Sequence, residues 1–548
     1  MEPSYPSRPG ALVTRNVLVA LIAVTLASIF VEVRYLGIDN SDPSNRTRFH
    51  ALPVAISQIY HGRSHDYTAD RPIAMLFQQG GPLSEIIAQA IRMQVPKDAA
   101  TYFWVADDRG LSDFVNVAFR LFGPTISALA YFWIFLLGMS LVTATVRFWR
   151  DPLALIVLAC TTVGIGAVLP VWTRAASAEF AETSLNLSES RMFDVLGIVA
   201  AVHLILVMIR PKATGRLVDV VCLVLQACFI AALIHARSSV AWLFLAVIAV
   251  ALAMLALRLW LGASKGPSLV APAIVVTTVV AAFLAMLGYQ RVMFNPTYFA
   301  ASGPRTFWHN VLMGVGQDDV LAAATGVTEV SDKGAIDAVL LNMKRRDDPR
   351  LTEDWERQNI LYSLGGHGTF DWQTYEQVAR ELVIRTILSH PVAFVRLFFW
   401  DRPADDARIL LCRFGGLAAT CTRTQTAWVG PEKLAAGAPF VWLWLGIIGL
   451  VATSALSAGD CPLMDHGAGQ VMGGLIVATV VGLSPSLIVY PTVVQLGGDA
   501  VLIYSIGALS AILATRTLHK RLQQFSGHRA GHSIAAQSFD DREDIDET

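Results

Sequence analysis

Two pairs of carboxylates stand out in the first long polar segment of the chain. Asp39 and Asp42 follow directly after the first apolar run, and Asp107 and Asp108 lie farther along the same segment. A carboxylate within hydrogen-bonding distance of a hydroxyl group can take its proton and act as a general base. Aspartate is also common in turns and at helix N-termini, where it caps the backbone. Each pair is therefore a candidate general base or a local turn.

Basic and aromatic side chains supply candidate contacts to an anionic substrate. Arg191 precedes an apolar run, and Arg305 and His309 lie among aromatic residues of the second long polar segment. Arginine binds phosphate through two parallel hydrogen bonds, which favours it over lysine at such sites. Because Trp and Tyr also collect at membrane interfaces, an interfacial belt is the alternative for this stretch. His50 is a further candidate contact, or else a surface histidine.

The composition indicates that these residues belong to a membrane protein. Hydrophobic residues make up 54% of the 548-residue chain and charged residues only 16%, whereas soluble domains carry about 25% charge. The charge is absent from several windows of roughly 20 residues, a length that crosses a bilayer core of about 30 Å as a helix. The sequence therefore predicts an all-α polytopic membrane protein and excludes a soluble enzyme or a disulfide-dense secreted domain.

Ten apolar runs predict ten transmembrane helices. The first, near Val17–Phe30, is not followed by a cleavage site of small residues, so we expect it to remain as an anchor. The other nine are expected near Thr125–Val146, Pro152–Trp172, Met192–Ile209, Leu217–Ala236, Val240–Leu261, Leu269–Leu287, Phe440–Ala458, Val471–Val489 and Ala500–Leu513.

The basic residues predict how these helices are oriented. The short polar segments on one side, with the N-terminus, carry twelve Lys and Arg residues, against three on the other side. The positive-inside rule then places both termini in the cytoplasm, and parity places the segments 37–124 and 291–439 outside. We expect a bacterial inner membrane with the active site facing the periplasm, where Cys412 and Cys421 could form a disulfide.

The expected organisation has five parts. They are a cytoplasmic N-terminus at 1–16, a transmembrane module at 17–290 with the outer loop 37–124, an extracytoplasmic helical region at 291–439, C-terminal transmembrane helices at 440–515, and a disordered cytoplasmic tail at 516–548.

Helical periodicity predicts two amphipathic helices in the outer loop, at His50–His61 and Leu83–Val95, lying in the membrane interface. Together with the cytoplasmic N-terminus, the acidic residues after the first span and the segment 118–123 before the second, this layout resembles the GT-C superfamily of integral-membrane glycosyltransferases. The resemblance covers roughly residues 15–290. The acidic doublet that this family places directly after its first span is replaced here by Asp-Asn-Ser-Asp at 39–42, which leaves the choice of base open.

The resemblance implies a reaction and its partners. A GT-C enzyme transfers a sugar from a polyprenyl-phosphate donor, here to an extracytoplasmic glycan or lipid acceptor. Asp39 or Asp42 would be the base, and Arg191 and Arg305 would bind the donor phosphate. The other candidate contacts to the substrates would be His50, Asp107, Asp108 and His309.

A transporter or flippase of a lipid-linked or polar substrate is the alternative function, and a non-catalytic assembly factor is a third. Transporters carry intramembrane polar residues and inverted repeats, whereas this sequence shows no repeat and one clear ionisable residue near a span centre, His203. We expect His203 to bond to a neighbouring helix.

Charge and cysteine content bear on cofactors and other partners. The net charge of −1 gives no reason to expect a nucleic acid. The six cysteines show no metal-ligand spacing, and Cys160, Cys222 and Cys228 are expected to be buried in apolar runs. The sequence establishes no cofactor, and a requirement for a divalent metal stays open.

Overall fold

Eight helices in the described part of the chain are long and apolar enough to cross a membrane. The computed structural model describes residues 9–35, 50–63, 68–79, 81–103, 110–174, 192–210, 216–262, 268–294, 307–357, 371–405, 462–488 and 498–518. The eight helices are α1 (Pro9–Tyr35), α6 (Ile126–Phe148), α7 (Pro152–Arg174), α9 (Arg216–Ala236), α10 (Ala241–Leu261), α11 (Val270–Met293), α22 (Pro462–Ile488) and the C-terminal helix Gly498–Leu518. The protein is an integral membrane protein.

Eight of the ten predicted spans therefore coincide with these helices. A ninth, α8 (Phe193–Ile209), is an apolar helix of 17 residues, and the predicted span Phe440–Ala458 lies outside the described residues. Nearly every α8 side chain is buried, because α6, α7, α9, α10, α11 and α22 all pack against it. A helix that is apolar on all sides belongs at the centre of a bundle, and α8 occupies that place.

The segment between the first two spans forms a small module that we call the first module. Its elements are α2 (Leu52–Tyr60), β1 (Thr68–Asp70), α3 (Arg71–Gln78), α4 (Leu83–Arg92), β2 (Thr101–Phe103) and α5 (Leu111–Phe122). The structure has a helix at each of the two positions predicted for amphipathic helices, α2 and α4. The antiparallel pairing of β1 with β2 was not predicted, and neither were α3 and α5.

One expectation about this module was wrong. Every residue from Leu52 to Gln58 of α2 is buried, since β1, α3, α4 and α5 surround it, so α2 has no face left for an interface. The segment 118–123 precedes the second span and contains the end of a separate helix, α5. Gly123 has a φ of +85°, which glycine adopts without strain, and Pro124 cannot continue a helix.

A second module follows α11 and has a hydrophobic core of its own. It consists of α13 (Phe307–Val315), α14 (Asp319–Thr325), α15 (Asp332–Arg345), α17 (Trp372–Ser389), α18 (Pro391–Arg396) and the π-helical turn η6 (Leu397–Asp401). The helical stretch from Trp372 to Asp405 is bent by 103° between α17 and α18. Pro391 explains the bend, because its ring removes a backbone donor and is best tolerated in the first turn of a helix.

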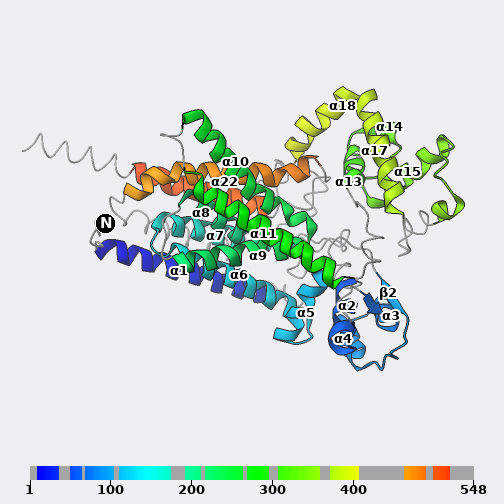
Figure 1. Ribbon diagram of the computed structural model, residues 1–548, viewed down its shortest axis with the longest axis horizontal. Coiled ribbons are helices and arrows are strands. Elements are labelled where there is room, and N and C mark those ends of the chain that lie inside the picture. Colours follow the sequence, from blue (N-terminus) through cyan, green and yellow to red (C-terminus); the bar gives the residue numbers. More distant parts are fainter. Residues whose placement is uncertain are drawn as a thin grey trace, which may run out of the picture.

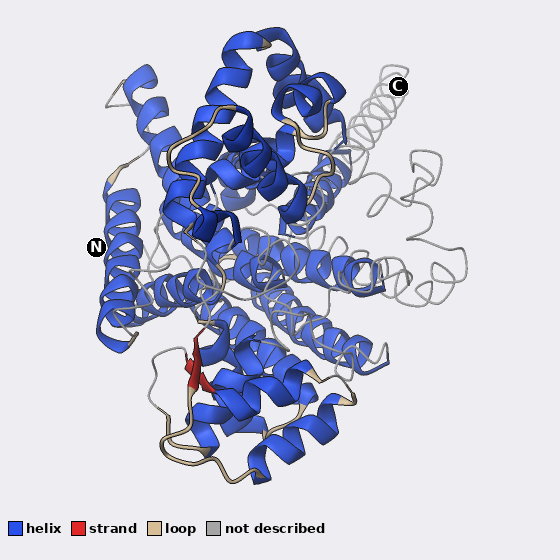
Figure 2. Ribbon diagram, turned by 90° about the vertical axis from the view of Figure 1, so that its right-hand side faces the viewer, coloured by secondary structure: helices blue, strands red, loops and turns tan. Residues whose placement is uncertain are grey.

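Both modules lie at the same end of the helical bundle, where α1 and α11 end and α6 begins (Figure 1). Figure 2 views that end of the molecule, with the second module above and the first module, which carries the strands, below. We call it the module end. The opposite end, where α1 begins and α6 ends, carries several arginines: Arg15, Arg147, Arg150, Arg210, Arg258 and Arg516.

The cysteines of the spans behave as expected with one exception. Cys160 and Cys222 are buried, whereas Cys228 is exposed on the outward side of α9. An apolar run therefore did not imply burial, because a lipid-facing helix surface is as apolar as the core. Cys412 and Cys421 lie outside the described residues.

The second module supports a prediction about acid stability. The Arg350 guanidinium donates to both carboxylate oxygens of Asp348, at 2.9 and 2.7 Å, and to both of Glu381 on α17, at 3.0 and 2.9 Å. These hydrogen bonds lower the pKa of both carboxyl groups. Lowered pKa values contribute stability that is fully present above the ordinary carboxyl pKa and is lost as pH falls through the lowered values.

We expect Arg350→Ala to cost about 1 kcal/mol of stability at pH 7, and expect the difference from the wild type to shrink below about pH 4. Thermal unfolding of both proteins between pH 7 and pH 3.5 measures this. Arg357→Ala is the control, because Arg357 is 73% exposed and its ion pair with Asp354 joins residues three positions apart on one helix. A difference that persists undiminished at low pH would contradict the assignment.

Candidate functional site

Most candidate site residues from the sequence lie outside the described residues. They are Asp39, Asp42, Asp107, Asp108, Arg191 and Arg305. His50 and His309 are described. The site can therefore be built from the described residues that flank these segments and from the side chains they meet.

Two of those flanks meet at His235, in the last turn of α9 at the module end. Gly110, the first described residue after the Asp107–Asp108 segment, donates its backbone N–H to the His235 carbonyl at 2.9 Å. Phe294, the last described residue before the Arg305 segment, packs edge-on against the His235 ring at 5.7 Å. Gly110 and Phe294, which border the two segments, therefore lie beside the same residue, His235.

The residues that follow the Arg191 segment lie beside these contacts. Phe193, which opens α8 after the Arg191 segment, packs on Phe114 of α5, with ring centroids 4.8 Å apart. Phe114 is one residue after Asp113. The start of α5, the start of α8 and the ends of α9 and α11 therefore converge at one point of the module end.

At this point Asp113, His235, Tyr289 and Gln290 form a hydrogen-bonded cluster. His235 Nε2 lies 2.8 Å from Asp113 Oδ2, and the Tyr289 hydroxyl donates to the same oxygen at 3.1 Å. Gln290 Nε2 lies 2.9 Å from His235 Nδ1. With the amide of Gln290 donating to Nδ1, the imidazole carries its proton on Nε2 and donates it to Asp113. The cluster is thus a carboxylate held by an imidazole and a phenol.

Local structure explains why these side chains meet. Asp113 lies in the first turn of α5, whose apolar side packs against the bundle and the first module. His235, Tyr289 and Gln290 occupy the last turns of two neighbouring spans, α9 and α11. Gly110 is required between them, because a Cβ atom there would lie 2.2 Å from Cδ2 of His235.

A second polar cluster lies nearby around the N-terminus of α8. Asp194 accepts hydrogen bonds from the backbone N–H of Val195 at 2.7 Å and of Gly498 at 3.1 Å. Arg237, which is also buried, lies close enough to interact with it electrostatically. A Cβ at Gly498 would approach Trp242 to 2.8 Å. These contacts join α8 to the C-terminal helix, so we assign Asp194 a structural role.

Sequence reasoning missed the polar residues at this end of the spans. Asp113, Asp194 and His235 were not predicted, and neither was Glu32, which is fully buried near the end of α1 that lies at the module end. A signal was present for both His235 and Glu32: His235 is a titratable residue in the last turn of a predicted span, and Glu32 is one that follows two residues after another predicted span. Nothing in the local pattern distinguished Asp113 from a surface residue of an amphipathic helix.

His309 belongs to a different part of the protein from the Asp113 cluster. It is buried in the second module, with Nδ1 2.7 Å from the Tyr375 hydroxyl and Nε2 3.0 Å from Asp332 Oδ1. Its ring packs edge-on against Trp372. Both ring nitrogens thus have partners within the module. His50 lies directly before α2 and is partly buried.

The expectation for His203 was wrong. It is fully buried in α8, but within the described residues neither ring nitrogen has a hydrogen-bond partner. The ring instead packs edge-on against Phe148, with centroids 5.4 Å apart. An apolar neighbour on α6 therefore occupies the place where a polar partner was expected.

The described residues contain no group of three or more His, Cys, Asp or Glu side chains that could hold a metal ion. Asp113 and His235 together supply two such side chains. The four aspartates that the sequence offers as candidate site residues lie outside the described residues. A divalent metal site that includes them therefore stays a prediction.

Comparison with known proteins gives no match. No family model, no curated protein and no solved structure matches it. Function must therefore be argued from the site itself.

Proposed function

We propose that the protein is a membrane glycosyltransferase that moves a sugar from a polyprenyl-phosphate donor to a glycan or lipid acceptor. The observation that carries the proposal is the Asp113–His235 pair at the ends of the spans. The tail of such a donor stays in the bilayer, so its reacting C1–O bond lies at headgroup level. A catalytic carboxylate for this reaction must therefore stand where helices leave the membrane.

In the proposed reaction, an acceptor hydroxyl gives its proton to a carboxylate while its oxygen bonds to C1 of the sugar. The C1–O bond to the phosphate breaks, and polyprenyl phosphate leaves with the bonding electron pair. We assign the proton acceptor to Asp113, which His235 and Tyr289 hold in a fixed orientation. Asp39 and Asp42 are the alternative bases.

The leaving phosphate requires cationic partners, for which arginine is suited. Arg191 and Arg305 remain our candidates, since the segments that carry them start or end beside the Asp113 cluster. The glycan or lipid acceptor would enter from the side of the two modules.

The charge distribution supports an extracytoplasmic site. Among the described residues of the bundle, the end opposite the two modules carries more arginines (Arg15, Arg147, Arg150, Arg210, Arg216, Arg258 and Arg516) than the module end (Arg34, Arg174, Arg237 and Arg291). The positive-inside rule assigns the end with more arginines to the cytoplasm. In a bacterial inner membrane the two modules and the Asp113 cluster would then face the periplasm.

We expect the purified protein in lipid nanodiscs to bind a polyprenyl-phosphate sugar saturably and to release polyprenyl phosphate when an acceptor is present. A panel of donors that differ in the sugar, followed by chromatography of the lipid product, measures both steps. Water-soluble nucleotide sugars are the matched controls and should not serve as donors, because they cannot present C1 from the bilayer.

If no polyprenyl-linked sugar binds to the folded protein, the glycosyltransferase proposal fails. Transport or flipping of a lipid-linked substrate then becomes the leading function. Movement of a fluorescent lipid-linked sugar across proteoliposomes would test that alternative directly.

A further inference from the structure

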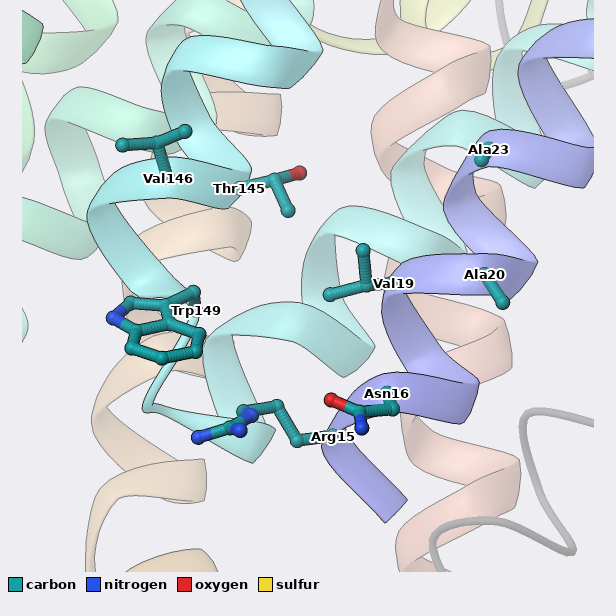
Figure 3. Close-up of a pocket in the computed structure, with 8 residues that line it drawn as sticks. All are labelled: Arg15, Asn16, Val19, Ala20, Ala23, Thr145, Val146 and Trp149. Atoms are coloured by element: carbon teal, nitrogen blue, oxygen red, sulfur yellow. The ribbon is translucent and has the colours of Figure 1, made fainter. Parts of the chain in front are cut away.

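A groove opens between α1 and α6 at the end of the bundle opposite the two modules (Figure 3). Its volume is about 540 Å³. Apart from three polar side chains its lining is apolar, and the residues that form it are Arg15, Asn16, Val19, Ala20, Ala23, Thr145, Val146 and Trp149. Both helices pack against α7, and α1 does so far more extensively than it packs against α6.

The mouth of the groove is cationic and aromatic. The Arg15 side chain reaches from α1 toward Trp149 (Figure 3), and its guanidinium carbon lies 4.2 Å from the centroid of the indole ring. The guanidinium carbon of Arg150 lies 5.1 Å from the same centroid. Arg15 Nε is buried and has no hydrogen-bond partner among the described residues. The Trp149 ring thus lies beside two guanidinium groups, and the Nε of one of them, Arg15, is a donor without a partner among the described residues.

The dimensions of the groove match one leaflet of a bilayer. Arg15 and Ala23 are eight residues apart, which is about 12 Å along a helix, and half of a hydrocarbon core is about 15 Å. Small side chains at Ala20 and Ala23 leave room beside α1 over this length. A hydrocarbon chain can therefore lie along the groove while its polar end stays beside Arg15.

We propose that this groove binds an anionic phospholipid, with its phosphate on Arg15 and Arg150 and an acyl chain between α1 and α6. Charge complementarity favours this occupant, because more of the described arginines of the bundle lie at this end than at the module end and anionic lipids attract basic residues at the cytoplasmic surface. Trp149 fits the same position, since tryptophan concentrates at headgroup level. The lipid connects α1 to α6. This site is separate from the Asp113 cluster and does not depend on the proposed function.

Native mass spectrometry of the full chain, released from detergent after titration with phosphatidylglycerol or with phosphatidylcholine of identical acyl chains, tests the proposal. We expect the wild type to retain phosphatidylglycerol preferentially. Arg15→Gln should lower its affinity about five- to tenfold, and Arg15→Gln with Arg150→Gln should remove the preference. Ala23→Phe fills the groove and should lower the occupancy of both lipids.

Arg258→Gln is the matched control, because it removes the same charge at the same end of the bundle from α10, which does not line the groove. It should leave the preference unchanged. Thermal unfolding of each variant shows that it is folded. Equal binding of the two lipids by the wild type would overturn the proposal and leave an unselective lipid contact. An Arg258→Gln effect as large as that of the double variant would also overturn it, since net charge would then account for the binding.

Discussion

Asp113→Asn is expected to lower sugar transfer by about 10²- to 10⁴-fold while leaving the protein folded. The amide cannot take a proton from the acceptor hydroxyl, but its oxygen can still accept the hydrogen bonds that now come from His235 and Tyr289. Donor affinity and the midpoint of thermal unfolding should stay close to those of the wild type. Initial rates of transfer, donor binding and thermal unfolding on one preparation measure the three quantities.

Asp318→Asn is the control for this substitution. Asp318 caps α14 in the second module, and asparagine caps a helix as well as aspartate does, so neither stability nor transfer should change. If Asp113→Asn transfers sugar at the wild-type rate, Asp113 is not the base. Asp39→Asn and Asp42→Asn then become decisive, followed by Asp107 and Asp108. A variant that unfolds instead would show that the Asp113–His235 pair holds α5 to the bundle.

Glu376→Ala is expected to destabilise the second module by about 3 kcal/mol. The Glu376 carboxylate is buried and accepts hydrogen bonds at 3.0 Å from the backbone N–H groups of both Trp308 and His309. Those groups belong to the first turn of α13, where backbone donors have no partner inside the helix and a negative charge is favourable. Each buried donor left unsatisfied costs about 1–3 kcal/mol.

Thermal unfolding and hydrogen exchange over residues 307–345 measure the effect, and exchange should rise in α13 before it rises in the spans. Gln377→Ala is the control, since Gln377 is the exposed neighbour of Glu376 on the same helix. Equal losses in the two variants would show that the carboxylate does not stabilise α13.

The spans could be predicted from the sequence because the signal for them is local. A run of about 20 apolar residues forms a helix in lipid whatever surrounds it, since every backbone hydrogen bond is made within the segment. The same holds for α4, whose apolar residues recur with the helical period along one side. The end of α5 was also locally visible, at Gly123 and Pro124, although α5 itself was not predicted.

The site could not be predicted in the same way, because its members are brought together by packing. Asp113 and His235 are separated by 122 positions, and His235 and Gln290 by 55. Their helices become neighbours only when α5, α9 and α11 pack against one another. No periodicity in the chain encodes that juxtaposition.

Two histidines show most clearly which features the sequence determined and which the tertiary structure decided. The sequence by itself determined that His203 lies inside an apolar helix and that His309 lies among aromatic residues. Only the tertiary structure decided that His203 meets Phe148, while His309 meets Tyr375 and Asp332. A hydrogen-bond partner is set by which helix faces the side chain, and that depends on contacts between segments far apart in the chain. Hydrophobic patterning determines which faces are buried, and tertiary packing determines what each buried group touches.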